Sequence, residues 1–124
     1  HAEGYALFRI IVGLMFVQHG AQKLLGWFGA QGTVPLLSLF GFAGTVELAG
    51  GLAIAVGFFS RLASVGGIAV MLGALATVHF PQGLVPIVNK GELALLFLAC
   101  FLIVVVHGNG KWSLEKLLLK KEVF

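Results

Sequence analysis

Seven polar side chains stand in otherwise apolar stretches of this sequence and have the groups needed for chemistry. They are Gln18, His19, Gln22, Lys23, Glu47, His79 and Glu92. Imidazole, amine and carboxylate groups can hydrogen-bond a small molecule and relay protons. An ionisable side chain is expensive in lipid, so each one there needs a partner or a wet cavity. What the seven residues can do depends on whether membrane-spanning helices bring them together.

The composition indicates an integral membrane protein. Of 124 residues, 59% are hydrophobic and 10% are charged, whereas soluble domains carry about 25% charged residues. A chain this short cannot bury so much apolar surface, which excludes a soluble globular domain, and disorder requires the opposite composition. The basic residues form no stripe outside the C-terminal tail, so we expect no nucleic-acid partner. Cys100 is the single cysteine, which excludes dithiol chemistry.

Four apolar segments approach the length of about 20 residues that a membrane helix needs. They cover approximately residues 5–25, 41–59, 61–80 and 90–107. Ser60 and Arg61 are predicted to form the turn between the second and third helices, and Pro81 to end the third. The apolar segment 30–40 is too short to span and is expected at the membrane interface. We therefore predict an all-α fold, an integral membrane four-helix bundle that forms one domain over residues 1–124.

The positions of lysine and arginine predict the orientation. With four spans, both termini and the turn before the third helix lie on one side of the membrane. That side carries Arg9, Arg61, Lys111, Lys116, Lys120 and Lys121, and the other side carries Lys23 and Lys90. Because positive charges accumulate on the cytoplasmic side, we expect both termini in the cytoplasm.

The C-terminal tail, residues 111–124, differs from the spans in pattern. Trp112 and the leucines can form one apolar helix face with the lysines around it, and Ser113 can cap the helix start. This pattern predicts a short amphipathic helix lying on an anionic membrane surface. The predicted surface anchors are Arg61, Lys111, Trp112, Lys116, Lys120 and Lys121.

The seven polar residues are expected in the outer half of the bundle. His19 and Glu47 each lie about 9 Å from the outer end of their predicted helices. His79 and Glu92 stand at the outer ends of the third and fourth helices. Two interpretations remain open. The residues form a polar pocket that binds a small molecule, or they are interhelical contacts in which Lys23 and histidine neutralise Glu47 and Glu92.

Metal binding is the weaker alternative for the same residues. Histidine and carboxylate side chains bind transition metals. No helix carries two of them at ligand spacing, such as His-x-x-His. We therefore expect no metal site, and a metal held jointly by His19, Glu47, His79 and Glu92 is the form that the alternative would take.

Four stretches of the sequence resemble the DoxX family of small bacterial and archaeal membrane proteins. Residues 9–26, RIIVGLMFVQHGAQKLLG, resemble its opening signature of Arg, Gly, an aromatic residue, His-Gly and Lys-Leu. Residues 44–64 resemble its second block, and residues 89–96 and 107–115 fit its later ones. The family's usual close is Gly-x-Gly followed by Ser-Leu-Asp, and here Glu115 stands in place of the Asp. The resemblance covers nearly the whole chain.

The resemblance implies a multi-pass protein of the cell membrane, the bacterial inner membrane or the archaeal plasma membrane, that takes part in redox processes. The family name comes from a subunit of a terminal quinol oxidase, and other members act in oxidative-stress complexes or redox-enzyme maturation. We therefore expect a redox-associated membrane subunit, at most part of a quinone-linked oxidoreductase, whose outer pocket binds a quinone or a similar small molecule. His19 and Lys23 would donate hydrogen bonds to it, and Glu47 or Glu92 would relay protons.

Two other functions remain open at this point. One is a membrane scaffold or assembly factor for a soluble redox or maturation partner, and the other is a small transporter. The cofactor is not determined by the sequence beyond a candidate quinone. Expected partners are the lipid bilayer and either a protein partner or further copies of the chain within the membrane.

Overall fold

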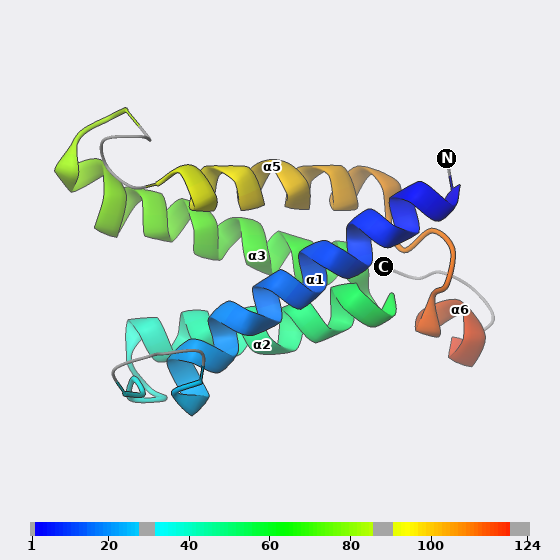
Figure 1. Cartoon of the computed structure of the whole chain (residues 1–124), viewed down its shortest axis with the longest axis horizontal. Coiled ribbons are helices and arrows are strands. Elements are labelled where there is room, and N and C mark those ends of the chain that lie inside the picture. Colours follow the sequence, from blue (N-terminus) through cyan, green and yellow to red (C-terminus); the bar gives the residue numbers. More distant parts are fainter. Residues whose placement is uncertain (1, 28–31, 86–90, 120–124) are drawn as a thin grey trace.

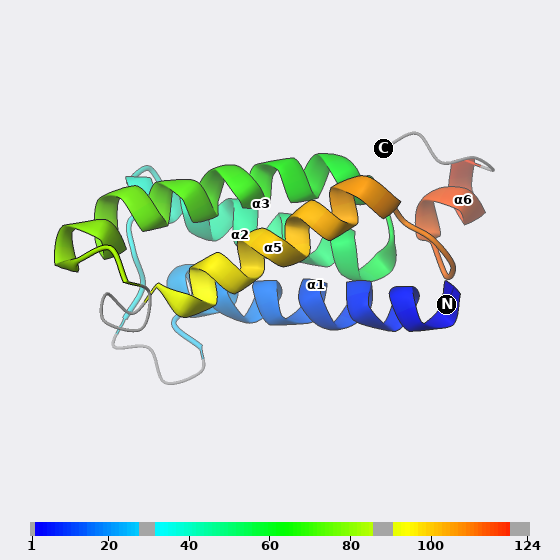
Figure 2. The ribbon, with the colours of Figure 1, turned by 90° about the horizontal axis from the view of Figure 1, so that it is seen from above.

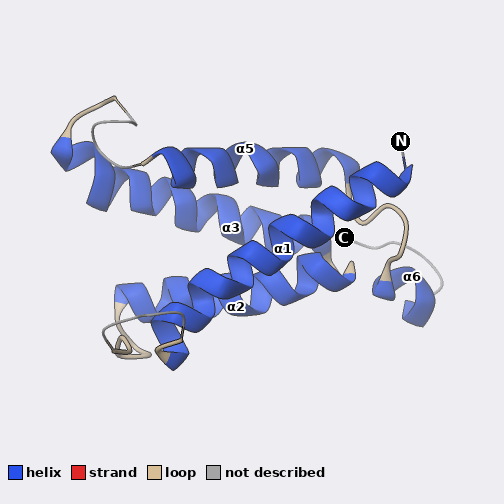
Figure 3. Cartoon of the chain, in the orientation of Figure 1, coloured by secondary structure: helices blue, strands red, loops and turns tan. Residues whose placement is uncertain are grey.

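The computed structural model describes residues 2–27, 32–85 and 91–119, and within these ranges the chain is helical and contains no strand (Figures 1 and 3). The main helices are α1 (Ala2–Leu25), α2 (Leu39–Val56), α3 (Ser60–Ala74) and α5 (Glu92–His107), with the short α6 (Leu114–Leu119) at the end. A π-helical turn, η1 (Leu75–His79), and a 3-10 turn, η2 (Phe80–Gln82), extend α3. Three of these stretches, Ala2–Leu25, Leu39–Val56 and Ser60–Gln82, are long and apolar enough to cross a membrane. α5 is equally apolar but shorter, with 16 residues.

The turn between α2 and α3 lies at residues 57–59, so the prediction of a turn at Ser60 and Arg61 was wrong. Gly57 adopts a left-handed conformation, with φ of 75°, and its N–H bonds to the carbonyls of Ala53 and Ile54. This is the usual way for a glycine to end a helix, because a Cβ atom disfavours positive φ. α2 therefore ends at Val56 instead of residue 59, and Ser60 already belongs to α3. Pro81 does not end the third span at residue 80, because it fits the first turn of η2.

The four long helices pack lengthwise as two pairs, α1 with α2 and α3 with α5 (Figures 1 and 2). A cavity lies toward the end where α1 stops and α2 starts, and we call this end the cavity end. The opposite end, where α1 starts, α5 stops and α6 lies, is the tail end. α2 and α3 are joined by the short turn at the tail end and diverge toward the cavity end (Figure 1).

Glycines bring α1 and α2 into backbone contact. A Cβ on Gly13 would lie 2.7 Å from the carbonyl oxygen of Gly51, and one on Gly20 would lie 2.8 Å from that of Gly44. Both pairs are seven residues apart along their helices, so they stack along one seam. Small residues are the usual means by which membrane helices approach closely. The α3–α5 pair is held similarly, since Gly67 leaves room for the ring of Phe101.

A buried polar cluster closes the tail end, and we call its members Arg9, Asn109 and Glu115 the tail clamp. All three side chains are fully buried. The Arg9 guanidinium donates to the carbonyls of Asn109, Lys111 (2.9 Å) and Trp112 (3.0 Å). It thereby satisfies carbonyl groups that follow α5 and ties them to α1.

Glu115 connects the same region to the α2–α3 turn. Its Oε1 accepts from the backbone N–H of Phe59 at 2.6 Å and from the amide of Asn109 at 3.0 Å. The Asn109 side-chain oxygen accepts in turn from the N–H of Ser60 at 3.2 Å. The tail clamp therefore joins α1, the α2–α3 turn and α6 at one point.

Of the tail predicted to be helical, residues 111–124, the structure describes a helix over Leu114–Leu119, and hydrogen bonds attach this region to the α2–α3 turn; residues 120–124 lie outside the described part. Ser113 caps α6 by accepting from the N–H of Lys116 at 3.2 Å, which confirms the predicted cap. Its hydroxyl also donates to the carbonyl of Gly57 at 2.7 Å. Exposed on α6 are Leu117 and Leu118.

The predicted surface anchors also make contacts within the chain. Arg61 donates to the Val105 carbonyl at 2.9 Å, Lys111 pairs with Glu3 at 2.8 Å, and Lys116 donates to the Gly110 carbonyl at 3.1 Å. Trp112 is exposed, and Lys120 and Lys121 lie outside the described residues.

Candidate functional site

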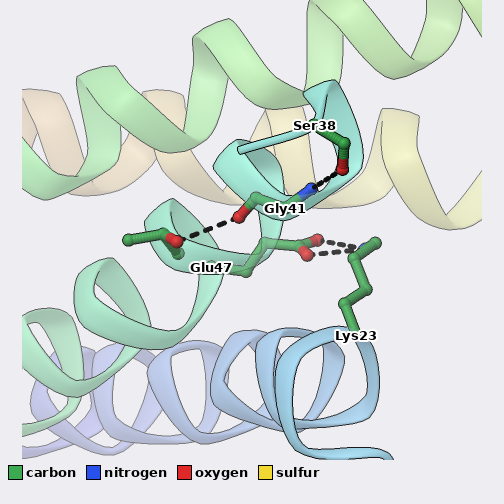
Figure 4. A network of polar contacts seen from close by, with 5 residues as sticks. Lys23, Ser38, Gly41 and Glu47 are labelled. Carbon is green, nitrogen blue, oxygen red and sulfur yellow. Dashed lines mark hydrogen bonds and ion pairs between the residues drawn. The ribbon is translucent and has the colours of Figure 1, made fainter. Parts of the chain in front are cut away.

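An ion pair between α1 and α2 stands at the centre of the predicted polar cluster (Figure 4). The Lys23 ammonium donates to Oε1 of Glu47 at 2.6 Å and to Oε2 at 2.9 Å. Glu47 is only 3% exposed. The two side chains reach each other because Gly44 lets α1 come close, so that a Cβ there would lie 3.1 Å from that of Lys23. The contact between Lys23 and Glu47 fits both interpretations of the cluster, a small-molecule pocket and an interhelical contact.

The start of α2 lies next to this pair and is stabilised by a capping side chain. The Ser38 hydroxyl accepts from the N–H of Gly41 at 3.0 Å and caps the helix (Figure 4). It also donates to the carbonyl of Pro35 at 2.6 Å, which holds the preceding turn against the helix. Gly41 is required here, because a Cβ would overlap backbone atoms of Leu36. The segment before α2 is therefore tightly folded onto the helix over its described part.

A cavity of about 550 Å³ lies beside the ion pair, lined by residues of α1, α2, α3, η1 and α5. Its volume is within the range of typical small-molecule sites, about 300–1,000 Å³. Its polar lining includes His19, Lys23, Glu47 and His79, while the remaining surface is mainly apolar. The His19 ring lies edge-on to Phe97, with ring centroids 5.6 Å apart. The combination of a long apolar wall and a few polar groups suits a molecule with a polar head and an apolar tail.

The seven sequence-predicted residues divide into two groups. Four of them, His19, Lys23, Glu47 and His79, line the cavity. The other three, Gln18, Gln22 and Glu92, are exposed and do not line it. The division follows from helix rotation, because Gln18 and Gln22 lie on the face of α1 turned away from the other helices. Within the described ranges, no three His, Cys, Asp or Glu side chains gather as a metal-binding group.

Two glycines of α3 contribute open space to the cavity. Gly66 and Gly73 both line it. A Cβ on Gly73 would meet no atom within 4 Å, and one on Gly66 would meet only Val46 at 3.4 Å. Their seven-residue spacing was the available signal, but it does not distinguish a helix contact from an open wall. Here the missing side chains create space.

Sequence reasoning also missed the tail clamp. Arg9 was noted only for its positive charge and as the arginine of the family's opening signature, and Glu115 only as a substitution for the family's aspartate. Both are fully buried and hydrogen-bonded. For Glu115 the available signal is the Gly-rich HGNG segment shortly before Ser-Leu-Glu, within residues 107–115, which places a carboxylate close to a sharp turn, and no such local signal points to Arg9.

Comparison with known proteins identifies the family. The family model described as DoxX matches residues 4–80. The chain belongs to the DoxX family. The DoxX match covers α1, α2, α3 and η1, and therefore includes all four polar residues of the cavity.

Two relatives extend the DoxX similarity over the whole chain. An uncharacterized protein of Haemophilus influenzae is 36% identical over 94% of this chain and 91% of its own length. The inner membrane protein YqjF of Escherichia coli is 27% identical over 95% of this chain and 94% of its own length. No solved structure gives a significant match. Together with the long apolar helices, these similarities confirm that this DoxX protein is located in the cell membrane, where its helices contact lipid.

Proposed function

We propose that this DoxX protein is a redox-associated subunit of the inner membrane that binds a quinone, or a similar tailed molecule, in the cavity. The observation that carries the proposal is the cavity itself, a largely apolar space of about 550 Å³ with His19, Lys23, Glu47 and His79 in its wall. The apolar wall would accommodate a tail, and the polar residues would hold a head group. The chain would act as part of a membrane oxidoreductase, with the electron carriers on its partners.

The ion pair would serve as a neutral hydrogen-bonding group. A lysine ammonium has three N–H donors, and Glu47 accepts with two oxygens. The third donor would bind a quinone carbonyl, as would an N–H of His19. Because Glu47 is a carboxylate in this pair, it would first take up a proton from water and then pass it to the oxygen of a head group that the partner's electrons have reduced. Because the two charges cancel, a neutral ligand would fit this site better than an anion.

The charge distribution supports an orientation for the four-helix bundle. Among the described residues, the tail end carries Arg9, Arg61, Lys111 and Lys116, and the cavity end carries Lys23. The positive-inside rule would then place the tail end and both termini in the cytoplasm. The cavity would open in the outer leaflet, where a membrane-dissolved quinone has access.

Filling the cavity tests the proposal directly. Gly73→Leu would place a side chain into the open space, since no atom lies within 4 Å of the position that a Cβ would take there. We expect affinity for a photoreactive short-tail quinone to fall at least about tenfold, which corresponds to about 1.4 kcal/mol of lost contacts. Ala99→Leu is the control, because it adds a leucine on the exposed face of α5, where Ala99 does not line the cavity.

A second variant tests how the quinone head group is bound. His19→Ala should weaken quinone binding while leaving helix content, measured by circular dichroism, unchanged. If Gly73→Leu and His19→Ala both bind the quinone as tightly as the parent protein, the cavity is not a quinone site.

A further inference from the structure

One face of α1 is turned away from the rest of the molecule, as Figure 2 shows by placing α1 along one edge. The exposed residues on this face are Gly4, Leu7, Ile11, Leu14, Met15, Gln18, Gln22 and Leu25. All but two of them are apolar or glycine, as expected of a surface in contact with lipid. Gln18 and Gln22 are the exceptions, and they stand in the second half of a helix long enough to cross the bilayer.

The spacing on this face matches the seam of a helix pair. Gly4, Ile11, Gln18 and Leu25 follow one another at intervals of seven, with Leu7 and Leu14 between them. Alternating steps of three and four are the pattern by which one helix packs along another. A straight helix drifts by about 20° per heptad relative to such a seam. Because of that drift, the seam position between Gln18 and Leu25 is occupied by exposed Gln22 and not by buried Ala21.

Gln18 is one of the two polar residues on this seam. It makes no hydrogen bond to any other described residue, whereas exposed Thr45 and Thr77 bond to carbonyls of their own helices at 2.9 Å and 2.7 Å. An amide facing hydrocarbon without a partner is unfavourable. The exposed face of α5 between Leu93 and Val106 is apolar by contrast, so lipid can cover it at no such cost.

We propose that this face of α1 binds the same face of a second copy of the chain, forming a parallel homodimer around Gln18. The glutamine amide is self-complementary, because each has N–H donors and a carbonyl acceptor. A two-fold axis along the membrane normal brings identical residues together. Two copies insert with the same topology, so their Gln18 residues lie at the same depth and can exchange hydrogen bonds. A polar residue at one seam position also sets the register of the pair.

Cysteine cross-linking in inner-membrane vesicles tests the geometry. In a Cys100→Ala background, Leu14→Cys places a thiol on the seam, and Leu102→Cys places one on α5. The two leucines are 51% and 52% exposed, so the thiols differ in position and not in accessibility. Mild oxidation should yield a product of twice the monomer mass for Leu14→Cys and none for Leu102→Cys. Equal cross-linking of both, cross-linking of neither, or a product of another mass would overturn the proposal.

The hydrogen bond itself needs a separate measurement. Gln18→Leu keeps the side chain large and makes it more lipid-soluble, so insertion should be unaffected. We expect the dimer dissociation constant, measured by energy transfer between labelled chains in liposomes, to rise about three- to tenfold, the range that interhelical hydrogen bonds supply in membranes. Thr45→Val, which removes a polar group from the exposed face of α2, should leave it unchanged. An unchanged or lower dissociation constant for Gln18→Leu would refute the role of Gln18.

Discussion

Replacing Arg9 should destabilise the protein far more than replacing Arg61. Arg9 is fully buried and donates to the carbonyls of Asn109, Lys111 and Trp112. Arg61 is partly exposed and has one short bond, to Val105 at 2.9 Å, and a longer one at 3.4 Å. Arg9→Met and Arg61→Met are therefore the same substitution in two environments, which makes the second variant a control for the first.

The magnitude follows from the number of bonds and their burial. A hydrogen bond to a charged group contributes about 1.5–3 kcal/mol, so the three shorter bonds of Arg9 amount to roughly 4.5–9 kcal/mol. A fourth bond, to the carbonyl of Ala55 at 3.5 Å, adds little. The cost of burying the guanidinium, several kcal/mol, offsets part of this. Arg9→Met leaves each of these carbonyls without its donor, at about 1–3 kcal/mol per group, and removes the burial cost, so we expect a net loss of roughly 3–5 kcal/mol. For Arg61→Met, with one good bond at a partly exposed site, we expect about 1 kcal/mol.

Reversible unfolding in mixed micelles, followed by circular dichroism, measures both free energies under one set of conditions. A second measurement locates the effect, because loss of Arg9 should loosen the segment that leads into α6. Trypsin should therefore cut at Lys116 faster in Arg9→Met than in Arg61→Met, in proportion to the opened population. If the two variants lose the same free energy to within about 0.5 kcal/mol, within the usual range of surface substitutions, the tail clamp does not hold this end together.

Two further predictions concern α1 and α2. Gly13→Leu should lower the free energy of unfolding by at least about 3 kcal/mol, since its side chain would collide with backbone atoms of α2. Gly73→Leu, where a Cβ meets no atom within 4 Å, should have little effect. Similar losses for both variants in the same unfolding assay would contradict the contact between α1 and α2 through glycines. Lys23→Met should lower the free energy of unfolding by about 3–5 kcal/mol, because it leaves the Glu47 carboxylate buried and unpaired. Adding Glu47→Leu in the same chain should restore most of that free energy. A double-mutant cycle measures the coupling, and a value near zero would show that the two charges act independently.

The sequence by itself determined the class of protein and the approximate spans. A bilayer imposes length and apolarity on any segment that crosses it, and these are properties of consecutive residues. The helix ends were predicted to within about three residues, and the DoxX motifs identified the family. Local chemistry was equally readable, as the Ser113 cap shows, because a capping side chain and its N–H partner lie three residues apart.

Only the tertiary structure decided which face of each helix packs and which is exposed. The spans are apolar all round, so their hydrophobicity carries little information about rotation. Small-residue spacing could not distinguish Gly13, which contacts a neighbouring backbone, from Gly73, which leaves a cavity open. Rotation about the helix axis likewise places His19 at the cavity and the adjacent Gln18 on the exposed face of α1. The tail clamp joins residues about a hundred positions apart, and no local pattern reveals that Arg9 and Glu115 share one buried cluster until the helices are assembled.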